Sequence, residues 1–109
     1  MKLIFATCPT DHAKELAKTL LDAKLVACIN IIPSVLSMYI WDEAVVEDSE
    51  SLLLIKTSAS LVSAVKDAFH YAHPYDVPEF IAVDVDQAGS SHDYLAWVNQ
   101  VTQCSLSAV

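Results

Sequence analysis

Hydrophobic and polar positions recur at two different spacings along the chain, and these spacings predict its elements. Residues 2–8 (KLIFATC) form a short apolar, β-favouring run that ends at Pro9. A helix is predicted next, with Thr10 or Asp11 as the residue that caps its first turn. Its apolar positions recur three and four residues apart and predict one buried face, made of Ala13, Leu16, Ala17, Leu20 and Leu21.

The middle of the chain predicts a long hairpin. Residues 25–32 (LVACINII) are almost continuously apolar, which predicts a strand buried on both faces. Pro33 predicts a bulge or an edge and not the end of the strand, because residues 35–41 (VLSMYIW) resume a β-like composition. Residues 42–44 turn the chain, and residues 45–57 run back, polar at first and apolar later. We therefore expect the tip in solvent and the base in the core.

The second half predicts a helix, a strand and a final helix. The second helix begins at Ser58 or Ser60 and ends at Pro74, and residues 79–85 (EFIAVDV) form a strand. An S-x-x-D pattern at residues 90–93 begins the third helix. The predicted apolar faces are Leu61, Val65, Ala68, Phe69 and Ala72 in the second helix, and Tyr94, Leu95, Trp97, Val98 and Val101 in the third.

The order of these elements predicts a single α+β domain over residues 1–109. It reads β-α-β-β-α-β followed by a C-terminal helix, the arrangement of a ferredoxin-like sandwich with a long central hairpin. The first two helices cover one face of the sheet, so the third helix or a neighbouring chain must cover the other. The mean hydropathy of +0.40 and the 54% of hydrophobic residues are high for so short a chain, which favours a subunit interface.

Composition excludes several classes of function. The net charge is −8, from fourteen carboxylates and six lysines without arginine, so nucleic acid and anionic membranes are poor partners. The single glycine, Gly89, excludes the glycine-rich loops that bind dinucleotides and phosphates. No apolar run is long enough to cross a bilayer.

Cysteine usage and the first residues bear on the compartment. Cys8, Cys28 and Cys104 are an odd number without a C-x-x-C pair, which fits a reducing environment. The apolar stretch of the opening MKLIFATC is too short for a signal peptide. We expect a cytoplasmic protein.

The segment HPYDVPE, residues 73–79, holds the densest chemistry. His70 and His73 lie three residues apart near a helix end, so both imidazoles can face one ion, with Asp76, Glu79 or a cysteine completing a copper or zinc site. The alternative is structural, because the helix dipole alone favours histidine at this end and the two prolines turn the chain. The residues by themselves leave both interpretations open.

Three further features have a functional and a structural interpretation. Tyr39 and Trp41 alternate along one strand face, as a binding platform or as interface packing would. Lys56 ends an apolar run and can hold an anionic ligand, pair with Glu79, or simply extend its head to water. The carboxylates around the hairpin tip either attract divalent cations or keep an exposed hairpin soluble: Asp42, Glu43, Glu47, Asp48 and Glu50.

Taken together, the segments ACINIIPSVLSMYIW, LLLIKT, HPYDVPE and DYLAWVN resemble the CutA family of divalent-cation tolerance proteins, in the right order over nearly the whole chain. The resemblance implies a ferredoxin-like subunit, a homotrimer like that of the PII signalling proteins, and clefts between subunits. It implies a protein of metal tolerance that is not an enzyme, with copper or another divalent cation as its ligand and no organic cofactor. His73 is then the metal ligand, and the cleft is lined by Tyr39, Trp41, Lys56, Tyr75 and Glu79. The alternative is a PII-like module that acts through protein contacts without metal chemistry.

The sequence departs from the family pattern at the positions proposed to bind copper. The family's cysteine aligns with Thr7, beside Cys8, and its histidine pair aligns with Ala72 and His73. Neighbouring strand residues face opposite ways, so Cys8 is not a simple replacement for a thiol at position 7. Ser34 and Glu43 also stand where family members often have glycine, which predicts that those two turns are built differently.

Overall fold

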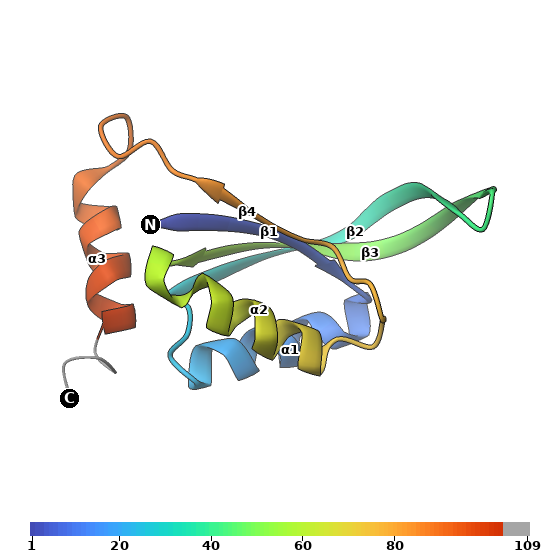
Figure 1. The fold of residues 1–109 in the computed structure, drawn as a ribbon, viewed down its shortest axis with the longest axis horizontal. Helices are drawn as coiled ribbons and strands as arrows, with labels where there is room; N and C mark the ends of the chain where they lie inside the picture. The colour runs from blue at the N-terminus through green and yellow to red at the C-terminus, as the bar shows by residue number, and fades with distance from the viewer. Residues whose placement is uncertain (104–109) are drawn as a thin grey trace.

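The computed structural model of this chain describes residues 1–103, which form four strands and three helices on one antiparallel sheet (Figure 1). The elements are β1 (Lys2–Cys8), α1 (Thr10–Asp22), β2 (Cys28–Trp41), β3 (Ala44–Thr57), a short 3-10 turn (Ala59–Leu61), α2 (Val62–Ala72), β4 (Phe80–Asp84) and α3 (His92–Gln103). The strand order is β2-β3-β1-β4. This confirms the predicted ferredoxin-like α+β fold.

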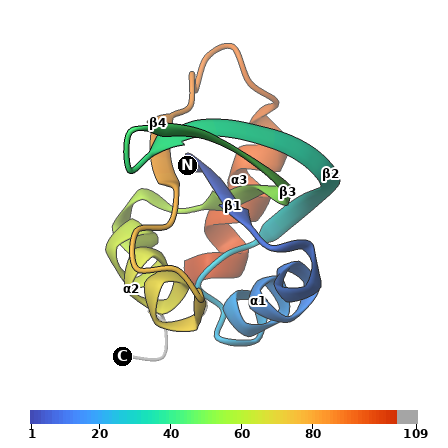
Figure 2. The same ribbon diagram turned by 90° about the vertical axis from the view of Figure 1, so that its right-hand side faces the viewer.

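The helices α1 and α2 lie side by side on one face of the sheet (Figure 2). The strand residues that point toward them alternate along each strand, as a half-buried sheet requires. Ile4 of β1 pairs with Ile55 of β3, and both are fully buried under Leu20 of α1 and Phe69 of α2. The core therefore lies between the sheet and these two helices.

The hairpin of β2 and β3 extends beyond the helices (Figure 1). Pro33 and Ser34 form the predicted bulge, because the pairing shifts between Ile32 and Val35. The tip is a two-residue turn, since Trp41 pairs directly with Ala44. Three residues at the bulge and the tip have a positive φ: Ser34 at 61°, Asp42 at 52° and Glu43 at 65°. The turns at Ser34 and Glu43 thus keep the left-handed conformation that glycine adopts most easily, although neither residue is glycine.

Several local predictions were wrong. Residues 25–32 were expected to be a strand buried on both faces, but β2 begins at Cys28 and is the edge strand, with Ile31 and Ile32 exposed in the single chain. The preceding residues leave α1 through a left-handed Lys24, and the Thr57 hydroxyl binds the Leu25 carbonyl at 2.6 Å. A side-chain bond thus replaces strand pairing there.

The helix starts also differ from the prediction. Thr10 lies inside α1, whose first turn is preceded by Pro9 without a side-chain cap. The hydroxyl of Ser58 turns away from its own helix and lies within hydrogen-bond reach of Asn99 and Thr102 of α3. The third helix begins at His92, and the amide of Leu95 donates to the carbonyl of Ser91. It therefore starts one residue later than the S-x-x-D pattern predicted.

The third helix stands at one end of the sheet and contacts β3 (Figure 1). Leu95 and Val98 are its buried apolar residues. On the sheet face opposite α1 and α2, Ile81 and Val83 of β4 stay exposed in the single chain. The described part of the chain contains no helix that is long and apolar enough to cross a membrane.

Candidate functional site

His73 is the first residue after α2, and its imidazole is buried against the end of β1. Its backbone is extended, at φ −84° and ψ 139°, as the following Pro74 requires. The Nε2–H donates to the carbonyl of Thr7 at 2.9 Å, while Nδ1 accepts the amide N–H of Tyr75 at 3.0 Å. Because Nδ1 accepts, the ring is the neutral tautomer with its proton on Nε2. Burial also lowers the pKa of His73.

These two hydrogen bonds bear on the predicted metal site. A metal ligand must offer a nitrogen lone pair, and the single lone pair of this ring faces the Tyr75 amide. His70 does not face the same point, because its Nδ1 lies 2.9 Å from the carbonyl of Lys66 in its own helix. Within residues 1–103, no three His, Cys, Asp or Glu side chains gather as a metal site requires. The ligand role of His73 stays a prediction, and it requires the bond to Tyr75 to open.

Glu50 lies at the base of the hairpin, and its side chain is only 6% exposed. The prediction of a solvated cluster at the tip is therefore wrong for this residue, although Asp42, Glu43 and Glu47 are exposed as expected. Glu50 pairs with Val35 just outside the bulge, one position beyond Ser51, where the pairing of β3 with β1 ends. Its alternation matches that of Leu52 and Leu54, and this was the signal in the sequence that it is not a tip residue.

Tyr39 and Asp48 lie on the same face of the hairpin as Glu50. The Tyr39 hydroxyl donates to Asp48 Oδ2 at 2.9 Å, a bond that raises the pKa of Tyr39. Partial burial raises the pKa of Tyr75, and the carboxylates of Asp48 and Glu50 raise it further. The two tyrosines are thus held at one negatively charged place, where the loop after α2 meets the hairpin.

The thiol of Cys8 borders the same place but is fully buried. Burial, together with the negative charges of Glu50 and Asp11, raises its pKa to about 11. A metal ligand must be a thiolate, so this environment opposes metal binding by Cys8. Thr7 accepts the His73 hydrogen bond with its backbone carbonyl. Its side chain lies on the sheet face opposite to that of the Cys8 side chain.

Other predicted cleft residues lie elsewhere in the single chain. Lys56 is near the far end of β3, where its Nζ donates to the Asn30 side chain and lies 3.9 Å from Cys28 Sγ. Glu79 is exposed and forms no ion pair with Lys56. Trp41 stands at the hairpin tip. One chain therefore gathers Tyr39, Tyr75 and His73, whereas Lys56, Glu79 and Trp41 are not joined to them. Cys104 lies outside the described residues.

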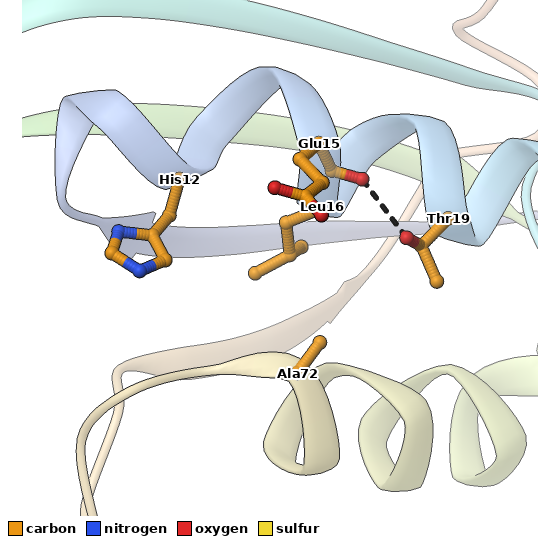
Figure 3. A pocket seen from close by; sticks show the side chains of 5 residues that line it. All are labelled: His12, Glu15, Leu16, Thr19 and Ala72. Carbon is orange, nitrogen blue, oxygen red and sulfur yellow. Dashed lines mark hydrogen bonds between the residues drawn. The ribbon is translucent and has the colours of Figure 1, made fainter.

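A separate groove of about 240 Å³ runs between α1 and α2 (Figure 3). His12 and Glu15 line it from α1, while Leu16 and Ala72 face each other across it. The Thr19 hydroxyl, also at its wall, donates to the Glu15 carbonyl at 2.9 Å. His12 Nδ1 lies 3.1 Å from Asp11 Oδ1. The residues that line the groove include none of the metal or cleft residues predicted from the sequence.

The comparisons with known proteins agree with the fold. Residues 2–101 match the model of the CutA1 divalent ion tolerance protein family. Protein CutA of Homo sapiens is 46% identical over 100 residues, which cover 91% of this chain but 55% of that protein, so the chain spans about half the length of this relative. The divalent-cation tolerance protein CutA of Thermus thermophilus is 37% identical over 102 residues, which cover 93% of this chain and 97% of that protein.

Solved structures of CutA proteins have the same fold as this chain. The PII-like protein CutA from Nostoc sp. PCC 7120 in its apo form superposes with a TM-score of 0.89 at 32% identity, over 94% of this chain and 97% of that one. CutA1 from Oryza sativa superposes with a TM-score of 0.87 at 38% identity, over 92% of this chain and 91% of that one. The sequence match, the sheet order and these superpositions agree, and the chain belongs to the CutA1 divalent ion tolerance family.

Proposed function

We propose that this chain forms a cytoplasmic homotrimer that takes part in tolerance or response to divalent metal ions, copper among them. In this proposal it is not an enzyme, and it binds a metal ion or a small ligand in clefts between subunits. The observation that carries the proposal is the family match over residues 2–101. The Thermus thermophilus relative, of almost the same length, bears the name divalent-cation tolerance protein.

The surface of the single chain supports assembly. Ile81 and Val83 are exposed on the sheet face that α1 and α2 leave open. The hairpin adds an apolar row on one side, because Ile40, 74% exposed, pairs with the exposed Val45, and Leu36 and Met38 alternate in phase with Ile40. Apolar surface of this extent is typical of subunit interfaces. Burial in a trimer accounts for it and for the high mean hydropathy.

The positions of the predicted cleft residues also fit a cleft between subunits. Within one chain Trp41 stands at the hairpin tip and Lys56 near the far end of the sheet. The hairpin extends beyond the other strands (Figure 1), so its tip reaches toward a neighbouring subunit. A cleft that uses Tyr39, Trp41, Lys56, Tyr75 and Glu79 together is then formed by residues of more than one chain.

Native mass spectrometry with and without copper tests the proposal. We expect the mass of three chains, and additional mass in steps of copper when the ion is supplied. A copper titration is expected to saturate with a dissociation constant below about 1 µM, roughly −8 kcal/mol. A monomer at the protein's working concentration contradicts the proposed assembly, and a trimer that takes up no copper contradicts the metal role.

The hydrogen bonds of His73 favour a second candidate, a PII-like module that acts through protein contacts. In this case His73 holds the loop after α2 and the subunit boundary, and no metal chemistry is involved. The variant His73→Ala separates the two candidates. A loss of copper affinity at unchanged thermal stability supports the metal role. A loss of thermal stability or of trimer, with copper binding unchanged, supports the structural role.

A further inference from the structure

A small polar cluster joins α3 to the end of β3. Ser58, the residue after β3, is 6% exposed, and its hydroxyl donates to Asn99 Oδ1 of α3 at 3.1 Å. The same hydroxyl lies within hydrogen-bond distance of the Thr102 hydroxyl. Thr102 is fully buried and also donates to the carbonyl of Val98 in its own helix at 2.8 Å. Hydrogen bonds between buried groups hold two elements in one position, because separation costs the bonds of both partners. We call Ser58, Asn99 and Thr102 the polar lock.

The apolar contacts of α3 are separate from the main core. Leu95 and Val98 are its buried apolar residues, and neither belongs to the core cluster that the sheet forms with α1 and α2. Tyr94 and Trp97, which were predicted on the same apolar face of the helix, remain 38% and 43% exposed. Segments with few buried apolar residues open at a lower free energy than the core of a protein does. We therefore expect α3 to open before the rest of the subunit unfolds.

The connection before α3 allows such a movement. Residues 85–91 join β4 to α3 and are exposed over most of their length (Figure 1). Their hydrogen bonds are local. The amide of Gly89 donates to Asp86 Oδ1 at 3.3 Å, and the Ser91 carbonyl accepts the amide of Leu95 in the first turn of α3. The helix can therefore swing on this segment while β4 stays paired with β1.

The thiol of Cys28 lies where α3 meets the sheet. Cys28 pairs with Lys56 at the start of β2, and Lys56 Nζ lies 3.9 Å from its sulfur. From α3, the side chain of Tyr94 is hydrogen-bonded to the same thiol. Burial raises the pKa of Tyr94, and this hydrogen bond raises it further. Cys28 is consequently half-buried, with Lys56 and Tyr94 as its neighbours. Opening of α3 removes the Tyr94 contact and exposes the sulfur.

We propose that α3 is a hinged latch, closed by the polar lock, and that its release uncovers the thiol of Cys28. In the closed state the contact between Ser58 and Thr102 holds the helix, and Tyr94 stands against the sulfur. In the open state the helix swings on residues 85–91, and a thiol reagent reaches Cys28. The latch lies within one subunit, so it depends neither on copper nor on the number of subunits.

Hydrogen exchange followed by mass spectrometry on the assembled protein measures the opening of α3. We expect the amides of residues 92–103 to exchange through a local opening, and faster than those of β1 and β3. Thr102→Val keeps the shape of the side chain and removes its hydroxyl, so exchange in α3 is expected to accelerate about fivefold. The matched control is Thr19→Val. It removes an exposed hydroxyl that donates to the carbonyl four residues earlier, as the hydroxyl of Thr102 does.

Timed labelling with iodoacetamide tests whether α3 covers Cys28. Thr102→Val is expected to speed the labelling of Cys28 by the same factor as the exchange of α3. Cys8 is fully buried in the core and serves as the reference for global unfolding, so its rate is expected to stay unchanged. Ser58→Ala breaks the lock from the other side and is expected to act alike. Because both changes remove one shared contact, the double variant is expected to label no faster than Ser58→Ala alone.

Three outcomes overturn the inference. In the first, the amides of α3 in the parent exchange as slowly as those of β1 and β3, a result that does not depend on how the variants fold. In the second, Thr102→Val accelerates exchange in α3 no more than Thr19→Val does, or accelerates all elements and the labelling of Cys8 together. In the third, exchange in α3 accelerates while the labelling rate of Cys28 stays unchanged, which shows that the helix does not cover this thiol.

Discussion

The imidazole of His73 donates from Nε2 to the backbone carbonyl of Thr7, which lies 66 positions earlier in the chain, at 2.9 Å. The same ring accepts the amide of Tyr75, so one side chain joins the end of β1, the end of α2 and the loop that leads to β4. Its ring also packs against Phe69 and Tyr75, at centroid distances of 5.1 and 5.0 Å. The segment HPYDVPE is held at its first residue.

This relationship predicts that acid weakens the fold. Burial lowers the pKa of His73 below its ordinary 6.5, although the Thr7 carbonyl and Glu50 oppose the shift and His12 and His70 reinforce it. The unfolded chain therefore binds the proton more readily than the folded chain does. The contribution of His73 to stability is complete above about pH 6.5 and is lost progressively as the pH falls from there through the lowered pKa. Thermal melting from about pH 8 to pH 5 is expected to show a falling Tm.

The variant His73→Gln separates this effect from other titrations. Glutamine can still donate to Thr7, but it does not titrate, so its Tm is expected to be lower at pH 8 and to change less between pH 8 and pH 5. His70→Gln is the control, because His70 is exposed and its hydrogen bond to the Lys66 carbonyl lies within its own helix. An equal acid slope in the parent and in His73→Gln contradicts the assignment.

The hairpin tip predicts a stabilising substitution. Asp42 and Glu43 both have positive φ, the backbone of a two-residue hairpin turn that favours Asp-Gly. An L-residue in this region carries a cost of about 1–2 kcal/mol, of which the flexibility of glycine in the unfolded chain cancels a part. Glu43→Gly is thus expected to raise the free energy of unfolding by about 1 kcal/mol.

Urea unfolding of the assembled protein measures this change at a fixed protein concentration. Glu43→Ala removes the same charge and keeps a β-carbon, so it is expected to show none of the gain. If alanine stabilises as much as glycine does, the gain comes from the lost charge among the acidic tip residues and not from the backbone.

The order of the elements could be predicted from the sequence because it depends on local spacing. The buried face of α1 is one example, although Leu21, which was expected on it, is exposed. The bulge at Pro33 is another, because it depends on the residues next to it in the strand. The exposed edge position of β2 was missed. An apolar run has the same composition in a central strand and in an edge strand that pairs with another subunit.

The candidate site depends on contacts that local spacing does not contain. In the sequence, Glu50 is one of five carboxylates near a turn. Only its spacing of two residues from Leu52, which puts both side chains on the same face of the strand, distinguishes it from the others. Glu50 raises the pKa of Tyr75 because the loop after α2 meets the hairpin. Tyr75 lies about 25 residues after Glu50 in the chain, so local spacing does not reveal this contact. Likewise, the sequence left open whether Lys56 holds an anionic ligand, pairs with Glu79 or extends its head to water, whereas the strand register places it beside Asn30 and Cys28.

The environment of Cys8 predicts an unreactive thiol. Its pKa of about 11 leaves roughly one thiolate in a thousand at pH 8, and the side chain is fully buried. Cys28 is half-buried, so we expect iodoacetamide to modify Cys28 well before Cys8. Peptide mass spectrometry after timed labelling measures both rates in one sample. Faster labelling of Cys8 contradicts this description of its surroundings.

The same reasoning predicts that copper binding does not depend on Cys8. The variant Cys8→Ser is expected to keep the copper affinity of the parent, with some loss of stability because a hydroxyl replaces a buried thiol. A tenfold loss of copper affinity in a folded Cys8→Ser protein contradicts the prediction and identifies Cys8 as a ligand despite its burial.

The open sheet face predicts where assembly is most sensitive to charge. Ile81 of β4 is about half exposed in the single chain, on the face opposite α1 and α2. In the proposed trimer this side chain is buried against a neighbour, so Ile81→Lys places an unpaired ammonium in an apolar contact. We expect light scattering after size exclusion to show smaller species, with the far-ultraviolet circular dichroism of the subunit retained. Tyr71→Lys is the control, because Tyr71 is 95% exposed on the outer side of α2. A trimer that tolerates Ile81→Lys as well as Tyr71→Lys excludes this sheet face from the interface and leaves the apolar row of the hairpin, around Ile40, as the surface to test.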